Sequence, residues 1–253
     1  MESLIGFFIA LAIGVTGVGG GTLTVPILVL ALGLQPAAAV GTSLLFVTLV
    51  KITAAPVYFR RGQIDFNVLK RLVLGGVPGV WIGALALSKL RSTALEPLIL
   101  TLVGSTIALL AIVSLYRTLW PSSAQRQEHK GMLVWCAFPI GLEVGFSAAG
   151  AGALGSLLLL HATRLKTASI VGTDLLFGLI ISIIGGGLHL AQGNVDLPLV
   201  LKLVAGGIPG AFLGAYLGTR LPGTAVRAVL SVLLVLLGGD LCWRGLSILM
   251  PRF

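Results

Sequence analysis

Charged residues are scarce in this sequence. Asp, Glu, Lys and Arg make up 10% of the 253 residues, hydrophobic residues make up 57%, and the mean hydropathy is +1.07. Soluble globular domains carry about 25% charged residues, so this chain has too little charge to cover the surface of a soluble domain of its length. Apolar runs long enough to cross a bilayer recur along the whole chain, which indicates a polytopic membrane protein.

Cysteine and histidine are also few, and they form no catalytic or metal-binding pattern. Cys136 and Cys242 both lie within apolar runs, as buried small hydrophobic residues do. His161 and His189 lack the spacing of metal ligands. The stretch GFSAA at 145–149 lacks the closing glycine of a serine-hydrolase elbow. We therefore predict that the protein is not an enzyme and uses no metal and no cofactor.

Clusters of basic residues are missing, although the net charge is +9. The 17 Lys and Arg residues stand singly or in pairs at the ends of apolar segments, as the inside-positive bias of membrane proteins predicts. The sequence has no basic stripe with interleaved aromatic residues, which argues against nucleic acid as a partner. The stretch 1–14 lacks a basic segment and a small-residue cleavage site, so we expect it to belong to the mature protein.

The sequence contains an internal duplication. A shift of 131 residues aligns the chain with itself without a gap, and 25 of 71 positions are identical between 14–84 and 145–215. VGTSLLF at 40–46, for example, aligns with VGTDLLF at 171–177. Self-similarity of this extent indicates two copies of one structural unit.

The two copies share one order of segments. We predict a first repeat over 1–120, a polar linker over 121–130 and a second repeat over 131–253. Each repeat begins with a glycine-broken apolar region, and three uninterrupted apolar spans follow. Their richness in Gly, Leu, Ala and Val favours helices over a barrel. The broken regions cover 3–32 and 132–160, and the spans cover about 37–58, 66–88, 94–116, 167–191, 197–218 and 224–243.

The broken regions allow two geometries, a kinked span or a re-entrant hairpin. As one straight helix, the first region would be about 45 Å long, against about 30 Å for the hydrocarbon core. Basic residues follow the first span of repeat one, at 60–71, but precede the first span of repeat two, at 161–166. If basic loops face the cytoplasm, the repeats are inverted, each broken region forms a hairpin, and both termini lie outside.

The sequence thus predicts an all-α polytopic membrane protein built from two inverted repeats. Each repeat has one glycine-broken, re-entrant helical segment plus three transmembrane helices. We expect it to be a multi-pass protein of the inner or plasma membrane.

The breaks are candidate binding sites. An interrupted helix leaves backbone groups at membrane depth that lipid cannot satisfy, and the N-terminus of a half-helix suits an anion. Inverted repeats with interrupted helices are typical of secondary transporters. We therefore expect TGVGGGT at 16–22 and SAAGAGA at 147–153 to meet around a substrate. The alternative is that these glycines only allow close helix packing.

Polar residues within the apolar spans are the next candidates, because a charge in lipid is costly and often functional. Lys51 lies in a span and aligns with Ser182, and Asp174 aligns with Ser43. Lys51 could hold an anion, and Asp174 could carry a coupling proton. The alternatives are that Lys51 snorkels to the surface or that the two form a structural ion pair. Glu143 is a second candidate for proton coupling, with a structural role as its alternative.

Other polar and helix-breaking residues have simpler interpretations. Asp65 and Asp196, equivalent in the two repeats, are expected to cap the helices that follow them. His189 is expected near the membrane surface. GGVPG at 75–79 and GGIPG at 206–210 are expected to kink their helices, and thereby to shape a cavity or to hinge.

Several of these stretches together resemble one known family. GVGGGTLTVPILVLALGL at 17–34, AVGTSLLFV at 39–47, G-x-I-D at 62–65 and GGVPGVWIGA at 75–84, with the set repeated in the second half, resemble the TauE/SafE sulfite exporter family, also called the TSUP permeases. The resemblance covers nearly the whole chain. It implies a bacterial or archaeal inner-membrane carrier that moves sulfite, sulfoacetate or other organosulfur anions, commonly outward.

The leading hypothesis is a secondary transporter, working as an exporter by alternating access, for small sulfur-containing anions such as sulfite or organosulfonates. The alternatives are a non-transporting membrane assembly or sensor protein, and an anion channel. The predicted partners are the small anion, the lipid bilayer and a coupling proton, carried by Asp174 or Glu143. The predicted substrate ligands are Gly17, Gly19, Gly20, Gly21, Thr22, Thr42, Ser43, Lys51, Ala148, Gly150, Gly152 and Thr173.

Overall fold

The computed structural model describes residues 1–16, 20–90, 95–119, 131–150, 152–218 and 223–249. Over this part of the chain the secondary structure is α-helical, without strands. The helices are α1 (Glu2–Thr16), α2 (Gly20–Leu32), α3 (Pro36–Arg60), α4 (Phe66–Lys89), α5 (Glu96–Leu119), α6 (Met132–Ser147), α7 (Ala153–Ala162), α8 (Thr167–Ala191), α9 (Leu197–Gly218) and α10 (Gly223–Leu249).

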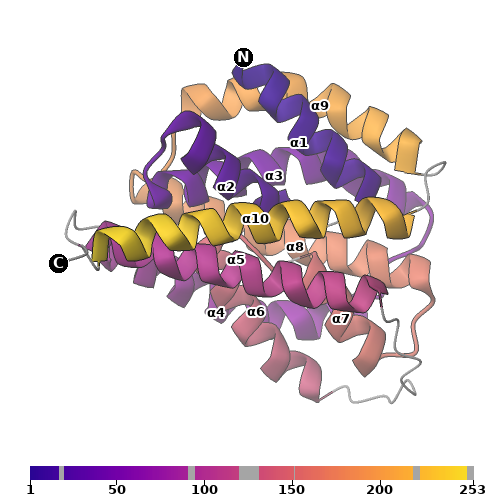
Figure 1. The fold of residues 1–253 in the computed structure, drawn as a ribbon. Helices are drawn as coiled ribbons and strands as arrows, with labels where there is room; N and C mark the ends of the chain where they lie inside the picture. Colours follow the sequence, from indigo (N-terminus) through magenta and orange to yellow (C-terminus); the bar gives the residue numbers. More distant parts are fainter. Residues whose placement is uncertain (17–19, 91–94, 120–130, 151, 219–222, 250–253) are drawn as a thin grey trace.

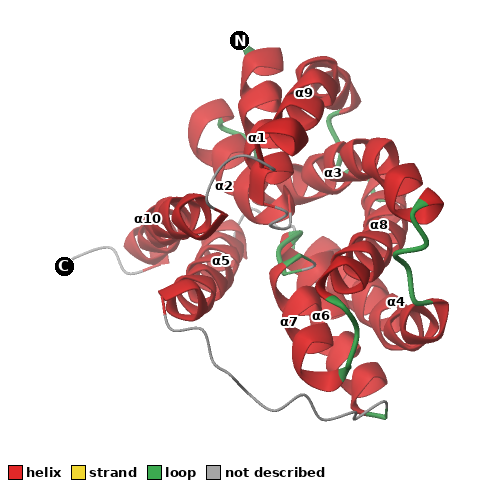
Figure 2. Cartoon of the chain, turned by 90° about the vertical axis from the view of Figure 1, so that its right-hand side faces the viewer, coloured by secondary structure: helices red, strands yellow, loops and turns green. Residues whose placement is uncertain are grey.

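The helices repeat with the same offset as the sequence. A shift of 131 residues carries the bounds of α3 onto those of α8, and it pairs α1 with α6, α2 with α7, α4 with α9 and α5 with α10. Figure 1 shows α1 and α9 at the top of the view, α6 and α7 at the bottom, and α3 and α8 between them. The same order appears in Figure 2. The central pair therefore consists of two equivalent helices, one from each half of the sequence.

Within the described residues, six helices are long and apolar enough to cross a membrane, namely α3, α4, α5, α8, α9 and α10. The four helices of the broken regions, α1, α2, α6 and α7, have 15, 13, 16 and 10 residues. At 1.5 Å per residue they are about 15–24 Å long, shorter than the hydrocarbon core of about 30 Å. The prediction of an all-α polytopic membrane protein is confirmed.

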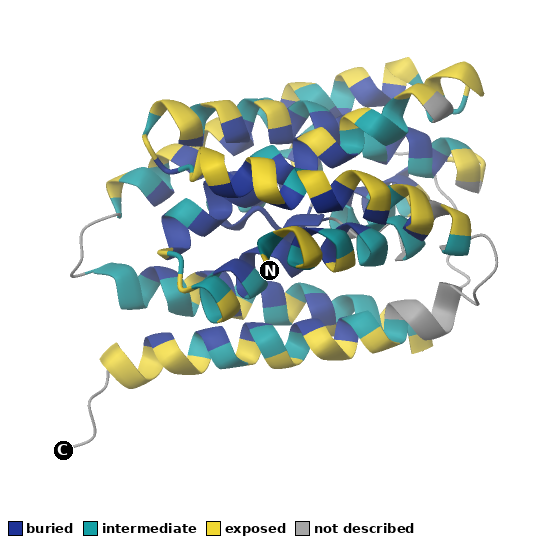
Figure 3. Ribbon diagram, turned by 90° about the horizontal axis from the view of Figure 1, so that it is seen from above, coloured by how far each residue is buried: buried dark blue, intermediate teal, exposed yellow. Residues whose placement is uncertain are grey.

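The outer surface of the bundle is apolar, as lipid contact requires. Figure 3 shows buried residues on the inward faces of the helices and exposed residues on the outward faces. Large apolar side chains are among the most exposed, including Trp135 at 81% and Val229 at 68%. In water such a surface would drive aggregation, whereas in a bilayer it is satisfied by acyl chains.

The equivalent helices α3 and α8 run antiparallel. Gly41, near the start of α3, packs against Asn194, just after the end of α8. In the same way Gly172, near the start of α8, packs against Gln63, just after the end of α3. The helices α5 and α10 are also antiparallel, since Gly104 packs against Cys242 while the hydroxyl of Ser231 donates to that of Ser114 over 3.1 Å.

The first half-helix of each broken region packs on a span of the other half of the chain. Gly206 of α9 faces the backbone of Ser3, and Gly214 faces that of Leu11, so α1 and α9 run parallel. The equivalent contacts join α4 to α6. They pair Gly75 with Val134, Gly79 with Phe138 and Gly83 with Leu142.

These contacts give the glycines of the two proline-containing motifs a role that the sequence analysis did not assign. Gly75 and Gly79 of GGVPG, like Gly206 and Gly210 of GGIPG, serve close helix packing, where a Cβ atom would meet the carbonyl oxygen of the facing helix. Both α4 and α9 continue through their prolines as uninterrupted helices. The glycines of the two motifs therefore fit the packing role of small residues in membrane helices.

Both broken regions fold back on themselves. In the first region, α9 runs parallel to α3, because the Asp196 N–H donates to Thr42 near the start of both helices and Gly207 lies against Val50 further along. Since α1 runs parallel to α9, it also runs parallel to α3. In contrast, α2 runs antiparallel to α3, because its first residue, Gly20, contacts Val47. It follows that α1 and α2 form a hairpin rather than a kinked span.

The second broken region, α6 and α7, also folds back on itself. The Asp65 N–H donates to Thr173 over 2.9 Å, and Gly76 packs against Phe177 and then Ile181, so α4 runs parallel to α8. The contacts between α4 and α6 make α6 parallel to both. The start of α7 lies at Asp174, while its end connects directly to the start of α8, so α7 is antiparallel to α8 and to α6.

Candidate functional site

The start of α2 meets the break between α6 and α7 in the interior. Gly21, in the first turn of α2, packs against the backbone carbonyl of Ala148, where α6 ends. A Cβ atom on Gly21 would collide with that carbonyl, so only glycine permits this approach. The predicted ligands Gly17 and Gly19 lie outside the described residues.

The break between α6 and α7 has an unusual backbone. Ala148 has φ of 59° and Gly150 has φ of 93°, and Gly152 is the N-cap residue of α7. The left-handed conformation is uncommon for alanine and is natural for glycine. This backbone turns the chain between two half-helices, and the two sites at which it turns were both predicted as ligands.

A carboxylate lies beside this turn. The Ser147 hydroxyl donates to Oε1 of Glu143 over 2.6 Å, and the Ala149 N–H donates to the Ser147 oxygen over 3.2 Å. The Thr106 hydroxyl of α5 also bonds to Glu143. Glu143 is thus tied both to the break and to a helix of the other half of the chain.

Asp174 caps the second half-helix, α7. The Ser156 hydroxyl donates to Oδ2 of Asp174 over 2.5 Å, and the Ser156 backbone N–H bonds to the same carboxylate. The other oxygen, Oδ1, faces Gly155 and has no hydrogen-bond partner among the described residues. The side chain is 5% exposed. A buried carboxylate at a helix N-terminus is stabilised by the helix dipole and by these donors.

Lys51 brings a positive charge to the same region. It lies on α3, is partly buried, and attracts the Asp174 carboxylate electrostatically. The structure therefore brings Lys51 and Asp174 together across the central helix pair. Both the structural ion pair and the functional role raised by the sequence require this proximity.

Ser43 takes the place of Asp174 in the first half of the chain. Its side chain is fully buried, and its hydroxyl has no hydrogen-bond partner among the described residues. Ser43, Val47 and Lys51 lie one turn apart on one side of α3, and Val47 contacts Gly20 at the start of α2. Ser43 and Lys51 thus flank the N-terminus of α2. The predicted ligand Thr22, which is also buried, lies in this first turn.

The predicted ligands Thr42 and Thr173 are engaged elsewhere. Thr42 accepts a bond from the Asp196 N–H over 3.0 Å, and Thr173 accepts one from the Asp65 N–H over 2.9 Å. Each bond joins the start of a central helix to a loop of the other half. Asp65 and Asp196 also cap α4 and α9, as predicted, by accepting from Val68 and Leu199.

The crossed threonine bonds were missed by the sequence reasoning. A signal was present, because both threonines and both aspartates are identical between the repeats. Ser156 and Thr106, which hold the two interior carboxylates, carry no such signal. Their roles depend on contacts between helices that are distant in the sequence.

His189, which was expected near the membrane surface, lies in the last turn of α8. Its side chain is fully buried, and Nε2 donates to the carbonyl oxygen of Gly145 over 2.9 Å. Alignment with Tyr58, which lies near the end of a span, does not reveal this contact.

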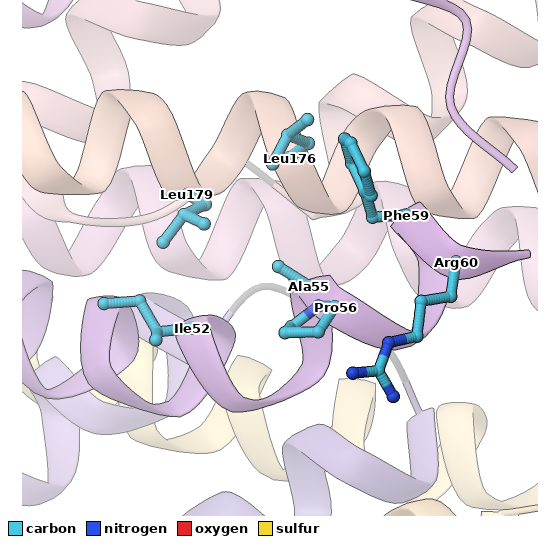
Figure 4. Close-up of a pocket in the computed structure, with 7 residues that line it drawn as sticks. All are labelled: Ile52, Ala55, Pro56, Phe59, Arg60, Leu176 and Leu179. Carbon is cyan, nitrogen blue, oxygen red and sulfur yellow. The ribbon is translucent and has the colours of Figure 1, made fainter. Parts of the chain in front are cut away.

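A separate groove of about 360 Å³ opens between α3 and α8 (Figure 4). It contains none of the predicted ligands. Apart from Arg60 it offers no charged or hydrogen-bonding side chain, so it is not suited to surround a small anion. Its lining residues are Ile52, Ala55, Pro56, Phe59, Arg60, Leu176 and Leu179.

Known proteins resemble the chain over almost its full length. A "Probable membrane transporter protein YjnA" of Bacillus subtilis is 29% identical over 245 residues, which cover 93% of this chain and 96% of the relative. A "Probable membrane transporter protein" of Xylella fastidiosa is 28% identical over 254 residues, covering 94% and 93%. No solved structure matches.

A family model gives the most specific result. The model described as "Sulfite exporter TauE/SafE" matches residues 3–241, which include both breaks and the central pair α3 and α8. Together with the transporter relatives and the six helices of the described part that are long and apolar enough to cross a membrane, this match agrees with the resemblance drawn from the glycine-rich stretches. The chain belongs to the sulfite exporter TauE/SafE family of membrane transporters.

Proposed function

We propose that the protein is a secondary transporter that exports small sulfur-containing anions, such as sulfite or organosulfonates, by alternating access. The observation that carries this proposal is the contact between Gly21 and Ala148. It brings the N-terminus of one half-helix against the break in the other half of the chain. Backbone N–H groups of a half-helix inside a membrane require a partner, and an anion supplies one.

The helix directions support two inverted repeats, over 1–120 and 131–253, joined by a polar linker over 121–130. The equivalent helices α3 and α8 are antiparallel, and each broken region forms a hairpin. Such a hairpin enters and leaves the membrane on the same side. In transporters built from inverted repeats, rocking of one repeat against the other around a central site exposes the substrate to the two sides of the membrane in turn.

The proposed site combines backbone donors, hydroxyl groups and one cation. We assign the backbone N–H donors to 17–22 and 148–153, of which 17–19 and 151 lie outside the described residues, and the positive charge to Lys51. Lys51 and Ser43 flank the start of α2, which supports their place in the site. The proposed hydroxyl ligands are Thr22 and Ser43, whereas Thr42 and Thr173 accept backbone bonds from Asp196 and Asp65.

Proton coupling is the finer part of the proposal. Protonation of Asp174 would remove its attraction for Lys51 and leave that cation to the substrate. Glu143 is the second candidate, because it lies at the α6–α7 break.

Flux measurements on proteoliposomes test the proposal. Purified protein should accumulate labelled sulfite or taurine with saturation, and an excess of unlabelled anion on the opposite side should drive counterflow. Conductance without saturation or counterflow would favour an anion channel. A flux equal to that of empty liposomes for every tested anion would favour an assembly or sensor protein.

A further inference from the structure

We propose that the chain holds a single substrate anion, at the start of α2, because Asp174 acts as a built-in anion at the equivalent start of α7. This inference rests on the proposed transport function and narrows its binding site to one repeat. It also gives Asp174 a specific part in that site, namely to exclude a second anion.

The second repeat supplies the first half of the argument. The Asp174 carboxylate lies in the first turn of α7, where it receives the hydroxyl and the backbone N–H of Ser156. This is the position that an incoming anion would take at a half-helix N-terminus. Asp174 is only 5% exposed. A substrate anion could therefore bind at this position only by displacing the Asp174 carboxylate.

The first repeat lacks this carboxylate. Ser43 stands in the equivalent position on α3, fully buried, with a hydroxyl that has no partner among the described residues. The contact of Gly20 with Val47 places the start of α2 on the side of α3 that carries Ser43 and Lys51. The N-terminus of α2 therefore lies beside the side of α3 that carries a buried hydroxyl without a partner among the described residues and a cation.

At two aligned positions, the sizes of the side chains differ in opposite directions between the repeats. Gly155 of α7 has no side chain, which leaves room for the Asp174 carboxylate against it. In the first repeat the residues aligned with Gly155 and Asp174 are the larger Thr24 and the smaller Ser43. The Thr24 hydroxyl donates to the Gly20 carbonyl over 2.7 Å. The carboxylate can therefore be exchanged between the repeats by changing two positions in each.

The decisive variant transfers the carboxylate to the first repeat. Thr24→Gly with Ser43→Asp should create a carboxylate cap on α2 and weaken sulfite binding, measured by titration calorimetry on the purified full chain, by at least about 100-fold, as expected when a like charge occupies the site. The matched control, Thr24→Gly with Ser43→Asn, has the same shape without the charge. It also replaces the proposed Ser43 ligand and therefore sets the baseline, so it should bind sulfite at least about 100-fold more tightly than the aspartate variant.

The reverse exchange covers the case in which the first variant does not fold. Gly155→Thr with Asp174→Ser removes the built-in anion from the second repeat and leaves the start of α2 intact. It should retain sulfite binding, with an affinity equal to or higher than that of the wild type because Lys51 loses a competitor. Loss of binding in this folded variant would overturn the inference.

The wild-type stoichiometry separates this inference from the proposed function. We expect one sulfite per chain. A wild type that binds neither sulfite nor taurine would contradict the proposed function itself. A wild type that binds two anions, or a folded Thr24→Gly, Ser43→Asp variant that binds as tightly as its asparagine control, would contradict only the single-site inference.

Discussion

Lys51 and Asp174 place opposite charges within the central helices of the bundle. A charged residue at the middle of a membrane helix costs about 2.5–3.5 kcal/mol on insertion scales, so each charge requires a compensating interaction. Asp174 receives the donors of Ser156 as well as the field of Lys51. Lys51 is attracted to Asp174. It also lies one helical turn from Val47, which contacts Gly20 at the start of α2, and a substrate anion bound there would neutralise the rest of the Lys51 charge.

Replacement of this cation tests its role. Lys51→Ala should weaken sulfite binding about 10- to 100-fold, since a charge-assisted hydrogen bond contributes about 1.5–3 kcal/mol. Lys51→Arg retains the charge and should keep most of the affinity. Titration of purified protein measures both, and an unchanged affinity in Lys51→Ala would remove Lys51 from the site.

Gly150 is a second residue whose role can be tested directly, because its backbone conformation favours glycine. Its φ of 93° is costly for any residue with a side chain, and a Cβ atom would also lie 3.4 Å from Glu143. Gly150→Ala should destabilise the protein by about 1–3 kcal/mol and lower its thermal unfolding midpoint in detergent.

Gly187 provides the matched control. It lies within α8, where a Cβ atom would meet nothing within 4 Å. Gly187→Ala should leave the midpoint unchanged or raise it, since alanine is the better helix former. Equal midpoints for the variants at 150 and 187 would mean that the left-handed turn is not required.

At the scale of the helices, the two halves are held together by equivalent contacts made twice. Glycines of α4 pack on α6, and those of α9 pack on α1. Each crossed threonine bond ties a central helix to the loop before α4 or α9. Because every such contact joins different halves of the sequence, neither half has a complete set of neighbours alone.

The glycine contacts predict a pair of matched defects. Gly79→Ala and Gly210→Ala each direct a Cβ atom at a backbone carbonyl, that of Phe138 or Phe7. Overpacking of this kind costs about 1–3 kcal/mol, so both variants should unfold at a lower temperature. Gly239→Ala, where the added atom meets nothing within 4 Å, should not. A normal midpoint in both contact variants would contradict the packing role.

The crossed bonds make a second prediction at this scale. Thr173→Val keeps the shape of the side chain but leaves the Asp65 N–H without its acceptor, and a buried donor left unsatisfied costs about 1–3 kcal/mol. Thr173→Ser retains the oxygen and should be nearly as stable as the wild type. If the valine and serine variants unfold at the same temperature, the hydroxyl does not hold the two halves together.

For the whole molecule, the hydropathy pattern predicted the membrane helices, and the duplication predicted which of them are equivalent. Both features can be recognised in the sequence without knowledge of tertiary contacts. The choice between hairpins and kinked spans needed tertiary contacts, such as Gly20 with Val47. The capping of α7 by Asp174 was also beyond the sequence, since it joins residues 18 positions apart through the turn between α7 and α8. The bond of His189 to a carbonyl 44 residues away was beyond the sequence for the same reason.

The orientation of the repeats can be tested in cells. Arg61 follows α3 and Ala191 ends α8, and both are exposed. With Cys136 and Cys242 replaced, Arg61→Cys and Ala191→Cys should be labelled by a membrane-impermeant maleimide from opposite sides of the membrane. Labelling of both from the same side would contradict inverted repeats.

The location of the anion tests the central claim most directly. Selenite has the charge and pyramidal shape of sulfite and carries an anomalous scatterer, so a crystal of the protein grown with selenite would report the position of the bound ion. We predict one selenium peak at the start of α2, between Gly21, Ser43 and Lys51. A peak at another place in the chain, such as the groove between α3 and α8, or no peak in a crystal of protein that binds selenite in solution, would contradict the account.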